Sequence, residues 1–188
     1  MASDAFKGMM RLRPVYALKS VYRNGPVGDR KESSAEHTFS ALVLADYLLS
    51  TYDFKLDSMK AMSLILSHDL VEIETGDIPI NHESRRANKK QEEAEGIRRL
   101  GKKFPEGYGK RVVALFDEFE EDKTREARFA KMIDGLDALM HFLDYKDAWK
   151  GWDEAMVRKY YEKRFSEFPV AKYIFEDILD YVKSNGYI

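Results

Sequence analysis

Apolar residues recur at helical spacing along almost every segment of this 188-residue chain. Intervals of three and four residues place side chains on one face of an α-helix, whereas a half-buried strand needs strict alternation. No pair of alternating segments joined by a hairpin turn stands out in the sequence. The pattern therefore predicts an all-α fold.

Capping residues and glycines predict where the first long helices begin and end. Ser33 and Glu36 have the spacing of a capping box, so a helix is expected to start there, after the glycine- and proline-containing break at 24–32. The next helix is predicted from about Asp57 to Gly76, because glycine is common where a helix stops.

The later helices differ in how much of their surface is apolar. Residues 83–103 are charged almost all round and predict an outer helix, and a helix over 106–121 is expected to be partly buried. Thr124 can cap a central helix that is dense in apolar residues. The last helix is expected to start at Pro169 and to stop at Gly186.

Length and charge limit the kind of protein. We expect a single domain over 1–188, with a core at about 12–150 and C-terminal helices over 153–186 packed on it. Lysine plus arginine (31) nearly balances aspartate plus glutamate (33), so no overall field favours a nucleic-acid polymer or an anionic membrane. No apolar run approaches the roughly 18 to 20 residues of a membrane-spanning helix, and a cytoplasmic protein is expected.

Ionisable residues interrupt the apolar stretch ILSHDLVEIETGDIP at 65–79. On a helix His68 and Asp69 would lie about 100° apart, so both can reach one ion over that edge. Glu72 follows one turn later, and Asp77 lies just beyond the expected helix end. A lone histidine on an apolar face is usually a hydrogen-bonded core residue. Buried carboxylates, however, are costly unless they are paired or coordinated, so the cluster predicts a positive partner.

Three motifs resemble those of the HD-domain metal phosphohydrolases. They are AEH at 35–37, HDLVEIETGDIP at 68–79 and ARFAKMIDGLDAL at 127–139. The E-x-x-x-x-G-D run within the second motif is similar to the branch of 5′-deoxyribonucleotidases. The resemblance extends over about residues 12–150 and implies a helical bundle with a metal site in its core.

The resemblance implies four metal ligands: His37, His68, Asp69 and Asp134. Spacing alone leaves the fourth ligand open, because Asp137 with His141 would also form a sound pair. The K-x-x-D pattern of the family places it at Asp134, three residues after Lys131. Cysteine is absent, and two imidazoles with two carboxylates suit one divalent ion from the set Mn, Co, Fe, Ni, Mg and Zn.

The resemblance implies catalytic roles for Glu72 and Asp77. One carboxylate would orient or deprotonate the attacking water, and the other would assist the leaving 5′-oxygen or a substrate hydroxyl. Which residue takes which role is left open by the sequence. Taken alone, Asp77 would be read as a turn aspartate after a glycine.

Arg23 resembles the phosphate-binding arginine of the nucleotidase branch, and a guanidinium fork suits phosphate oxygens. Arg30 and Lys19 are weaker candidates, since either can equally be a solvated surface charge. No tryptophan follows Arg23 where some members of the branch have one, so sugar and base recognition is expected to differ. Trp149 and Trp152 are interpreted as packing or dimer-contact residues.

These inferences predict a metal-dependent phosphohydrolase that removes phosphate from nucleoside 5′-monophosphates, with 2′-deoxyribonucleotides as the expected substrates. One rival is a phosphohydrolase of the same superfamily acting on cyclic or pyrophosphorylated nucleotides, and another is a nucleotide- or metal-binding module without turnover. The expected partner is a small nucleotide. The basic run Arg85, Arg86, Lys89 and Lys90 alternates with glutamates and predicts a solvated face. The resemblance implies a homodimer, for which the last helix and the tryptophan turn are the expected contact face.

Overall fold

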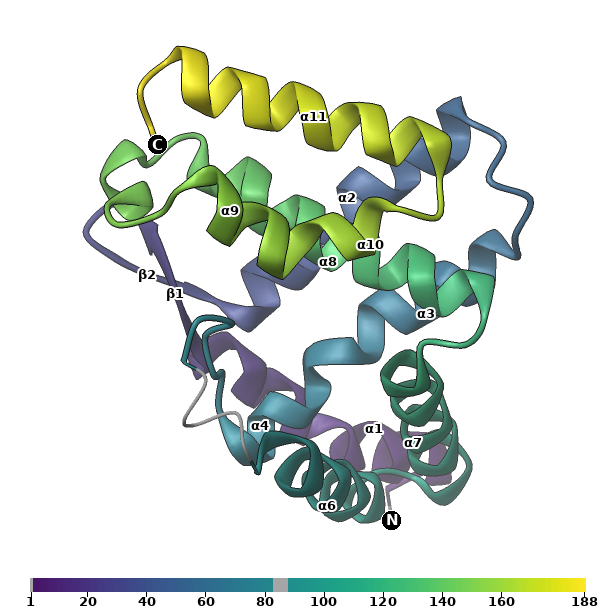
Figure 1. Cartoon of the computed structure of the whole chain (residues 1–188). Coiled ribbons are helices and arrows are strands. Elements are labelled where there is room, and N and C mark those ends of the chain that lie inside the picture. The colour runs from purple at the N-terminus through teal and green to yellow at the C-terminus, as the bar shows by residue number, and fades with distance from the viewer. Residues whose placement is uncertain (1, 83–87) are drawn as a thin grey trace.

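Helices form most of the chain in the computed structural model, which describes residues 2–82 and 88–188 (Figure 1). The helical elements are α1 (Asp4–Arg11), η1 (Arg13–Ser20), α2 (Ser34–Thr51), α3 (Ser58–Ser67), η2 (His68–Val71), α4 (Glu72–Thr75), α6 (Lys89–Lys103), α7 (Glu106–Glu121), α8 (Arg125–Phe142), η3 (Lys146–Trp149), α9 (Glu154–Val157), η4 (Arg158–Glu162), α10 (Lys163–Phe165) and α11 (Pro169–Ser184). The strands are β1 (Tyr22–Val27) and β2 (Arg30–Ser33). The predicted all-α fold is confirmed apart from this short pair of strands.

The strand pair corrects the expectation that no hairpin would form. β1 and β2 pair antiparallel, with Val27 opposite Arg30 and an irregularity between Tyr22 and Pro26. Gly28, with a φ of 58°, takes the first of the two turn positions, where a left-handed backbone favours glycine. Because the register is irregular and the strands contain few apolar residues, their sequences do not show the alternation of apolar and polar residues that is typical of a strand.

The predicted helix starts are confirmed by their caps. The Ser33 side chain accepts from the Glu36 amide while the Glu36 carboxylate accepts from the Ser33 amide, which completes the capping box of α2. The Asp57 side chain caps α3 by accepting from the Lys60 amide, and the Thr124 side chain caps α8 by accepting from the Ala127 amide. Each cap satisfies backbone donors that the first turn leaves without an intrahelical partner.

The helix predicted from Asp57 to Gly76 is divided into three parts. α3 ends at Ser67, a 3₁₀ turn, η2, covers His68–Val71, and α4 is a single turn that ends before Gly76. Gly76 has a φ of 72°, so the predicted stop is correct. The tighter 3₁₀ turn alters the directions in which the His68 and Asp69 side chains extend from those of a continuous α-helix.

The apolar core consists of two clusters that meet at η2. The larger cluster joins α2, α3, α8 and α11, and the smaller one joins η1, α6 and α7. Leu64 and Ile65 belong to the larger cluster, whereas Leu70 and Val71 belong to the smaller. His68 and Asp69 therefore lie where the two clusters join, with apolar packing on either side along the chain.

The C-terminal helices pack on the larger cluster, with α11 running along one end of the molecule and α6 and α7 at the other (Figure 1). Phe175, Ile178 and Val182 of α11 are buried there, and so is Trp149, whose indole N–H donates to the Phe142 carbonyl. The single domain expected over 1–188 stays a prediction. Other aromatic side chains of α11, Tyr173 and Tyr181, are exposed, and the expectation that this helix forms a dimer contact face stays a prediction.

Two further expectations concern the surface. Of the basic run, Arg85 and Arg86 lie outside the described residues, and Lys89 pairs with Glu93 at 3.1 Å. In residues 2–82 and 88–188 no helix combines the length and the apolar character needed to cross a bilayer.

Candidate active site

Two buried imidazoles face each other at the junction of the apolar clusters. His37 comes from the first turns of α2 and His68 from η2, and their ring centroids lie 5.5 Å apart. Their Nε2 atoms are the only fully buried side-chain nitrogen or oxygen atoms, among the described residues, that lack a hydrogen-bond partner. An unsatisfied buried polar atom is costly, so this pair indicates that a ligand atom or ion belongs between them.

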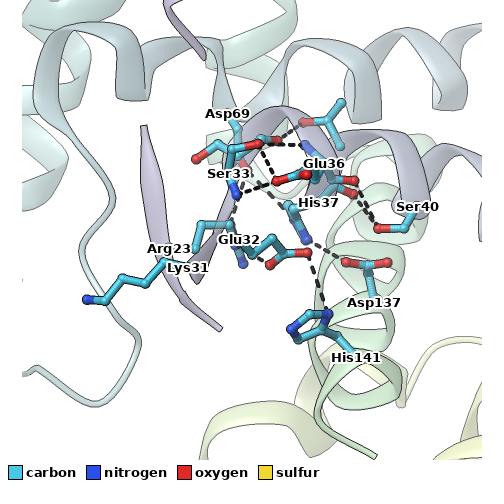
Figure 2. A network of polar contacts seen from close by, with 12 residues as sticks. Arg23, Lys31, Glu32, Ser33, Glu36, His37, Ser40, Asp69, Asp137 and His141 are labelled. Carbon is cyan, nitrogen blue, oxygen red and sulfur yellow. Dashed lines mark hydrogen bonds and ion pairs between the residues drawn. The ribbon is translucent and has the colours of Figure 1, made fainter. Parts of the chain in front are cut away.

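The second ring nitrogen of each histidine, Nδ1, has a hydrogen-bond partner. His68 Nδ1 lies 2.6 Å from the Ile65 carbonyl oxygen, and because a carbonyl only accepts, Nδ1 donates and the neutral ring keeps its lone pair on Nε2. His37 Nδ1 lies 2.6 Å from Oδ2 of Asp137 (Figure 2). Histidines that bind metals are usually held in this way through the second nitrogen.

Two carboxylates complete the arrangement. Asp69 Oδ1 lies 3.1 Å from His68 Nε2, and Asp134 Oδ1, from α8, lies 3.2 Å from His37 Nε2 and 3.8 Å from His68 Nε2. His37, His68 and Asp69 offer ligand atoms that all lie within 4.8 Å of one another. The four predicted ligands therefore meet, and their nitrogen and oxygen donors fit a divalent cation.

The structure places the rival residues for the fourth position elsewhere. Asp137 bonds Nδ1 of His37, on the opposite side of the ring from Nε2, so its position is that of an orienting partner. His141 lies one turn further along α8, where Nε2 lies 2.9 Å from the Pro26 carbonyl oxygen. This geometry supports Asp134 as the ligand, with Asp137 behind His37.

The charges in the site favour a cation. Burial and the charge of Arg23 act to lower the pKa of His37. The carboxylates of Asp134 and Asp137 outweigh them and raise this pKa to about 10. Burial acts to raise the pKa of Asp134, but the charges of Arg164 and the two histidines hold it well below its usual value. The carboxylates thus retain negative charge, which a divalent ion in place of the proton would neutralise.

Glu72 and Asp77 lie at the edge of this group. Glu72 is buried, and its Oε2 accepts a hydrogen bond of 2.5 Å from the Ser34 hydroxyl. Burial, together with the charge of Asp69, raises the pKa of Glu72 well above its usual value. Burial also raises the pKa of Asp77, against the charge of Arg23. A carboxyl group with a raised pKa can exchange a proton near neutral pH, as acid–base catalysis requires.

Arg23 is the candidate cation that the structure brings to the site. Its Nη1 lies 3.1 Å from Asp69 Oδ2 and its Nε lies 3.6 Å from Glu32 Oε2 (Figure 2). Arg30 instead pairs with Glu36 at the surface, and Lys19 lies over the ring of Tyr16. Neither of these two lines the cavity that contains Arg23.

A cavity of about 600 Å³ is lined by three of the four predicted ligands, His68, Asp69 and Asp134. Its polar wall includes Arg23, Glu72 and Asp77, and its apolar wall includes Trp149 and Trp152. Trp149 is buried in the larger apolar cluster and Trp152 contacts the rings of Tyr160 and Tyr161, so both tryptophans pack within the chain, as one of the two predicted roles requires. The volume suits a small organic ligand.

A family comparison agrees with this geometry. The family model described as an HD domain matches residues 15–171, which is most of the chain. The chain belongs to the HD-domain family. The resemblance inferred from the three motifs is thereby confirmed.

Relatives of this HD-domain chain include named enzymes. It is 29% identical over 150 residues to the 5′-deoxynucleotidase HDDC2 of Mus musculus, covering 78% of this chain and 74% of the relative. It is 32% identical over 139 residues to the protein of that name from Bos taurus, covering 72% of this chain and 66% of the relative. A structure titled as a predicted metal-dependent phosphohydrolase from Magnetospirillum magnetotacticum matches with a TM-score of 0.87 at 27% identity, covering 99% of this chain and 96% of that one.

The HD-domain site includes contacts that the sequence motifs did not reveal. Glu32 of β2 is buried between Arg23 and His141, with Oε1 3.7 Å from His141 Nδ1 (Figure 2). A Cβ atom added to Gly25 would lie 2.9 Å from His141 Nε2, so glycine permits the hairpin to approach α8. The hairpin that carries Arg23 is in this way fixed against the helix that carries Asp134.

A second unpredicted residue is Arg164 of α10, whose Nη1 donates to Asp134 Oδ2. It follows the motifs by about 25 residues and belongs to no recognisable pattern, and the charged residues around it in RKYYEKRFSE at 158–167 leave no signal that distinguishes it. The C-terminal helices therefore contribute to the site as well as packing on the core.

Proposed function

We propose that this protein is a metal-dependent phosphohydrolase that releases phosphate from nucleoside 5′-monophosphates and prefers 2′-deoxyribonucleotides. The observation that supports it most is the pair of unpartnered His37 and His68 Nε2 atoms beside Asp69 and Asp134, next to a cavity lined by His68, both aspartates and Arg23. The names of the curated relatives support the substrate class.

His37, His68, Asp69 and Asp134 would hold one divalent ion, for which Mn, Co, Fe, Ni, Mg and Zn are the candidates. Such an ion would supply Lewis acidity, which polarises a phosphoryl oxygen and makes water more acidic. The donor set excludes none of these metals, since each accepts imidazole or carboxylate ligands.

The chain's own residues would bind the substrate and move protons. The guanidinium of Arg23 would contact the phosphate oxygens, because it lines the cavity and Glu32 fixes its Nε. Glu72 is oriented by the Ser34 hydroxyl and Asp77 lies at the cavity wall, so the two carboxyl groups would exchange protons with water and with the leaving 5′-oxygen. Which of them is the base is decided by experiment.

Phosphate release by metal-stripped protein, resupplied with one metal at a time, tests the proposal. The substrates are ribo- and deoxyribonucleoside 5′-monophosphates, and the expected products are nucleoside and inorganic phosphate. Release that needs metal and favours the deoxy series supports the proposal. If the metal-loaded protein releases no phosphate from any of these substrates, the proposal is contradicted. Turnover of cyclic or pyrophosphorylated nucleotides would then favour the rival phosphohydrolase. Binding without turnover of any of them would favour the non-catalytic module.

Arg23→Lys is expected to raise KM for the nucleotide about tenfold or more while metal content stays unchanged. Lysine keeps the charge but loses the planar fork that matches phosphate oxygens. Steady-state kinetics and metal analysis measure the two quantities. Arg30→Lys is the matched control, because Arg30 lies on the same hairpin, is exposed and pairs with Glu36. Equal KM values in the two variants would exclude Arg23 from phosphate binding.

The remaining proposals concern the cellular location, the oligomeric state and the binding partner of the protein. A cytoplasmic location and a homodimer follow from the sequence and the family resemblance, and the mass of the protein in solution tests the second. A small nucleotide, rather than a nucleic-acid polymer, is the proposed partner because the cavity is of small-molecule size and the charges of the chain nearly balance.

A further inference from the structure

The two carboxylate oxygens of Asp134 have different surroundings. Oδ1 faces the imidazoles, 3.2 Å from His37 Nε2 and 3.8 Å from His68 Nε2. Oδ2 instead accepts a hydrogen bond from Nη1 of Arg164. Asp69 is arranged in a similar way, with Oδ1 3.1 Å from His68 Nε2 and Oδ2 paired with Arg23. An arginine is thus paired with each of the two carboxylates that face the histidines.

The local structure brings Arg164 to this position. A π-helical turn, η4 (Arg158–Glu162), directly precedes α10, and such turns are frequent at functional sites. Tyr161 and Arg164 line the cavity, whereas the next residue, Phe165, is buried in the larger apolar cluster. The backbone therefore directs the Arg164 side chain towards Asp134, whereas the preceding Lys163 is exposed and the following Phe165 is buried.

Helix α8 has a glycine where Arg164 passes over it. A Cβ atom added to Gly135 would lie 3.0 Å from Arg164 Cδ and 3.4 Å from Tyr161 Cδ1. Glycine within a helix is unfavourable relative to alanine, so a glycine next to Asp134 has a steric reason here. The close approach allows the guanidinium to reach the outer oxygen of the carboxylate.

We propose that Arg164 is a positioning residue of the metal site: it holds Oδ2 of Asp134, so that only Oδ1 is offered to the divalent ion. Its planar donors suit a carboxylate oxygen, and partners of this kind orient metal ligands. The inference rests on the proposed function only in requiring a metal at this site, and it does not depend on the substrate. A purely structural ion pair between α8 and α10 is the rival explanation.

Co²⁺ binding to Arg164→Met tests the proposal, with Lys163→Met as the matched control. Lys163 is the preceding residue, is exposed and carries the same charge. The visible d–d spectrum of bound Co²⁺ reports its ligand set, and titration gives its affinity. We expect an altered spectrum and about tenfold weaker binding in Arg164→Met. Loss of a nearby positive charge would by itself strengthen cation binding, so weaker binding has to come from lost orientation.

The spectrum decides between the two explanations. A wild-type spectrum in folded Arg164→Met would overturn the positioning role, whatever its affinity. If circular dichroism shows that this variant does not fold, the shorter polar Arg164→Gln takes its place, and failure of both to fold would favour the structural ion pair. Wild-type protein without a Co²⁺ spectrum would instead contradict the metal site and hence the proposed function, so the two failures are distinguishable.

Discussion

Replacing Asp134 with alanine is expected to abolish binding of the divalent metal, whereas Asp137→Ala is expected to bind it about 10- to 100-fold more weakly. The difference follows from which nitrogen of His37 each residue faces. Asp134 Oδ1 lies on the Nε2 side with His68 and Asp69, and Asp137 holds Nδ1 on the opposite side of the ring. Elemental analysis after dialysis against limiting Co²⁺ measures both, and phosphate release should fall with metal content.

Asp134→Asn is the control for folding, since alanine leaves Arg164 without its partner. The amide retains the shape of the side chain and a carbonyl oxygen, so the thermal transition should stay near that of the wild type while metal binding still weakens strongly. If Asp134→Ala keeps its full metal content and Asp137→Ala loses metal, the fourth ligand is Asp137, which is the alternative that spacing alone leaves open.

The predictable parts of this structure depend on local chemistry. Ser33 with Glu36, and Thr124, act within a few residues of themselves, so the sequence locates the helix starts that they cap. Gly76 likewise marks a helix end because its backbone needs a positive φ. Motif resemblance could assemble His37, His68, Asp69 and Asp134 without any knowledge of their distances.

The parts that the sequence did not predict depend on contacts between distant segments. Arg164 meets Asp134 across 30 residues, and its approach depends on a π-helical turn and on the space above Gly135. Glu32 meets His141 across more than 100 residues through an irregular hairpin. Helical periodicity does not record such pairings, since it reports which face of a helix is buried and not what that face contacts.

The roles of Asp137 and of the C-terminal helices illustrate the same limit. Asp134 and Asp137 share one face of α8, so spacing could not separate the proposed ligand from the residue proposed to orient His37. The separation comes from the orientation of the His37 ring, which is fixed by packing from α2 against α8. A similar argument explains why helices expected only to cover the core also supply a charged group to its site.

Glu72→Gln is expected to lower kcat by about 100- to 10,000-fold while the protein keeps its metal. Glutamine has the same shape as the glutamate, and its amide can retain the contact with Ser34, but it cannot exchange a proton. The variant therefore removes one chemical capacity from the site. Steady-state phosphate release and Co²⁺ titration measure the two effects separately.

Glu74→Gln is the matched control, because Glu74 lies on the same turn of helix and pairs with Arg99 and Lys103 away from the four ligands. Its kcat should stay within about twofold of the wild type, and unchanged turnover in Glu72→Gln would remove Glu72 from the mechanism.

The dependence of the rate on pH then shows whether Glu72 acts as the base or as the acid. Burial and the charge of Asp69 raise the pKa of Glu72, so a base would give a rate that rises as pH increases through that pKa, and an acid a rate that falls. If the rising part of the pH–rate profile disappears in Glu72→Gln, Glu72 is the base, and if the falling part disappears, it is the acid. Asp77 is then assigned the other role.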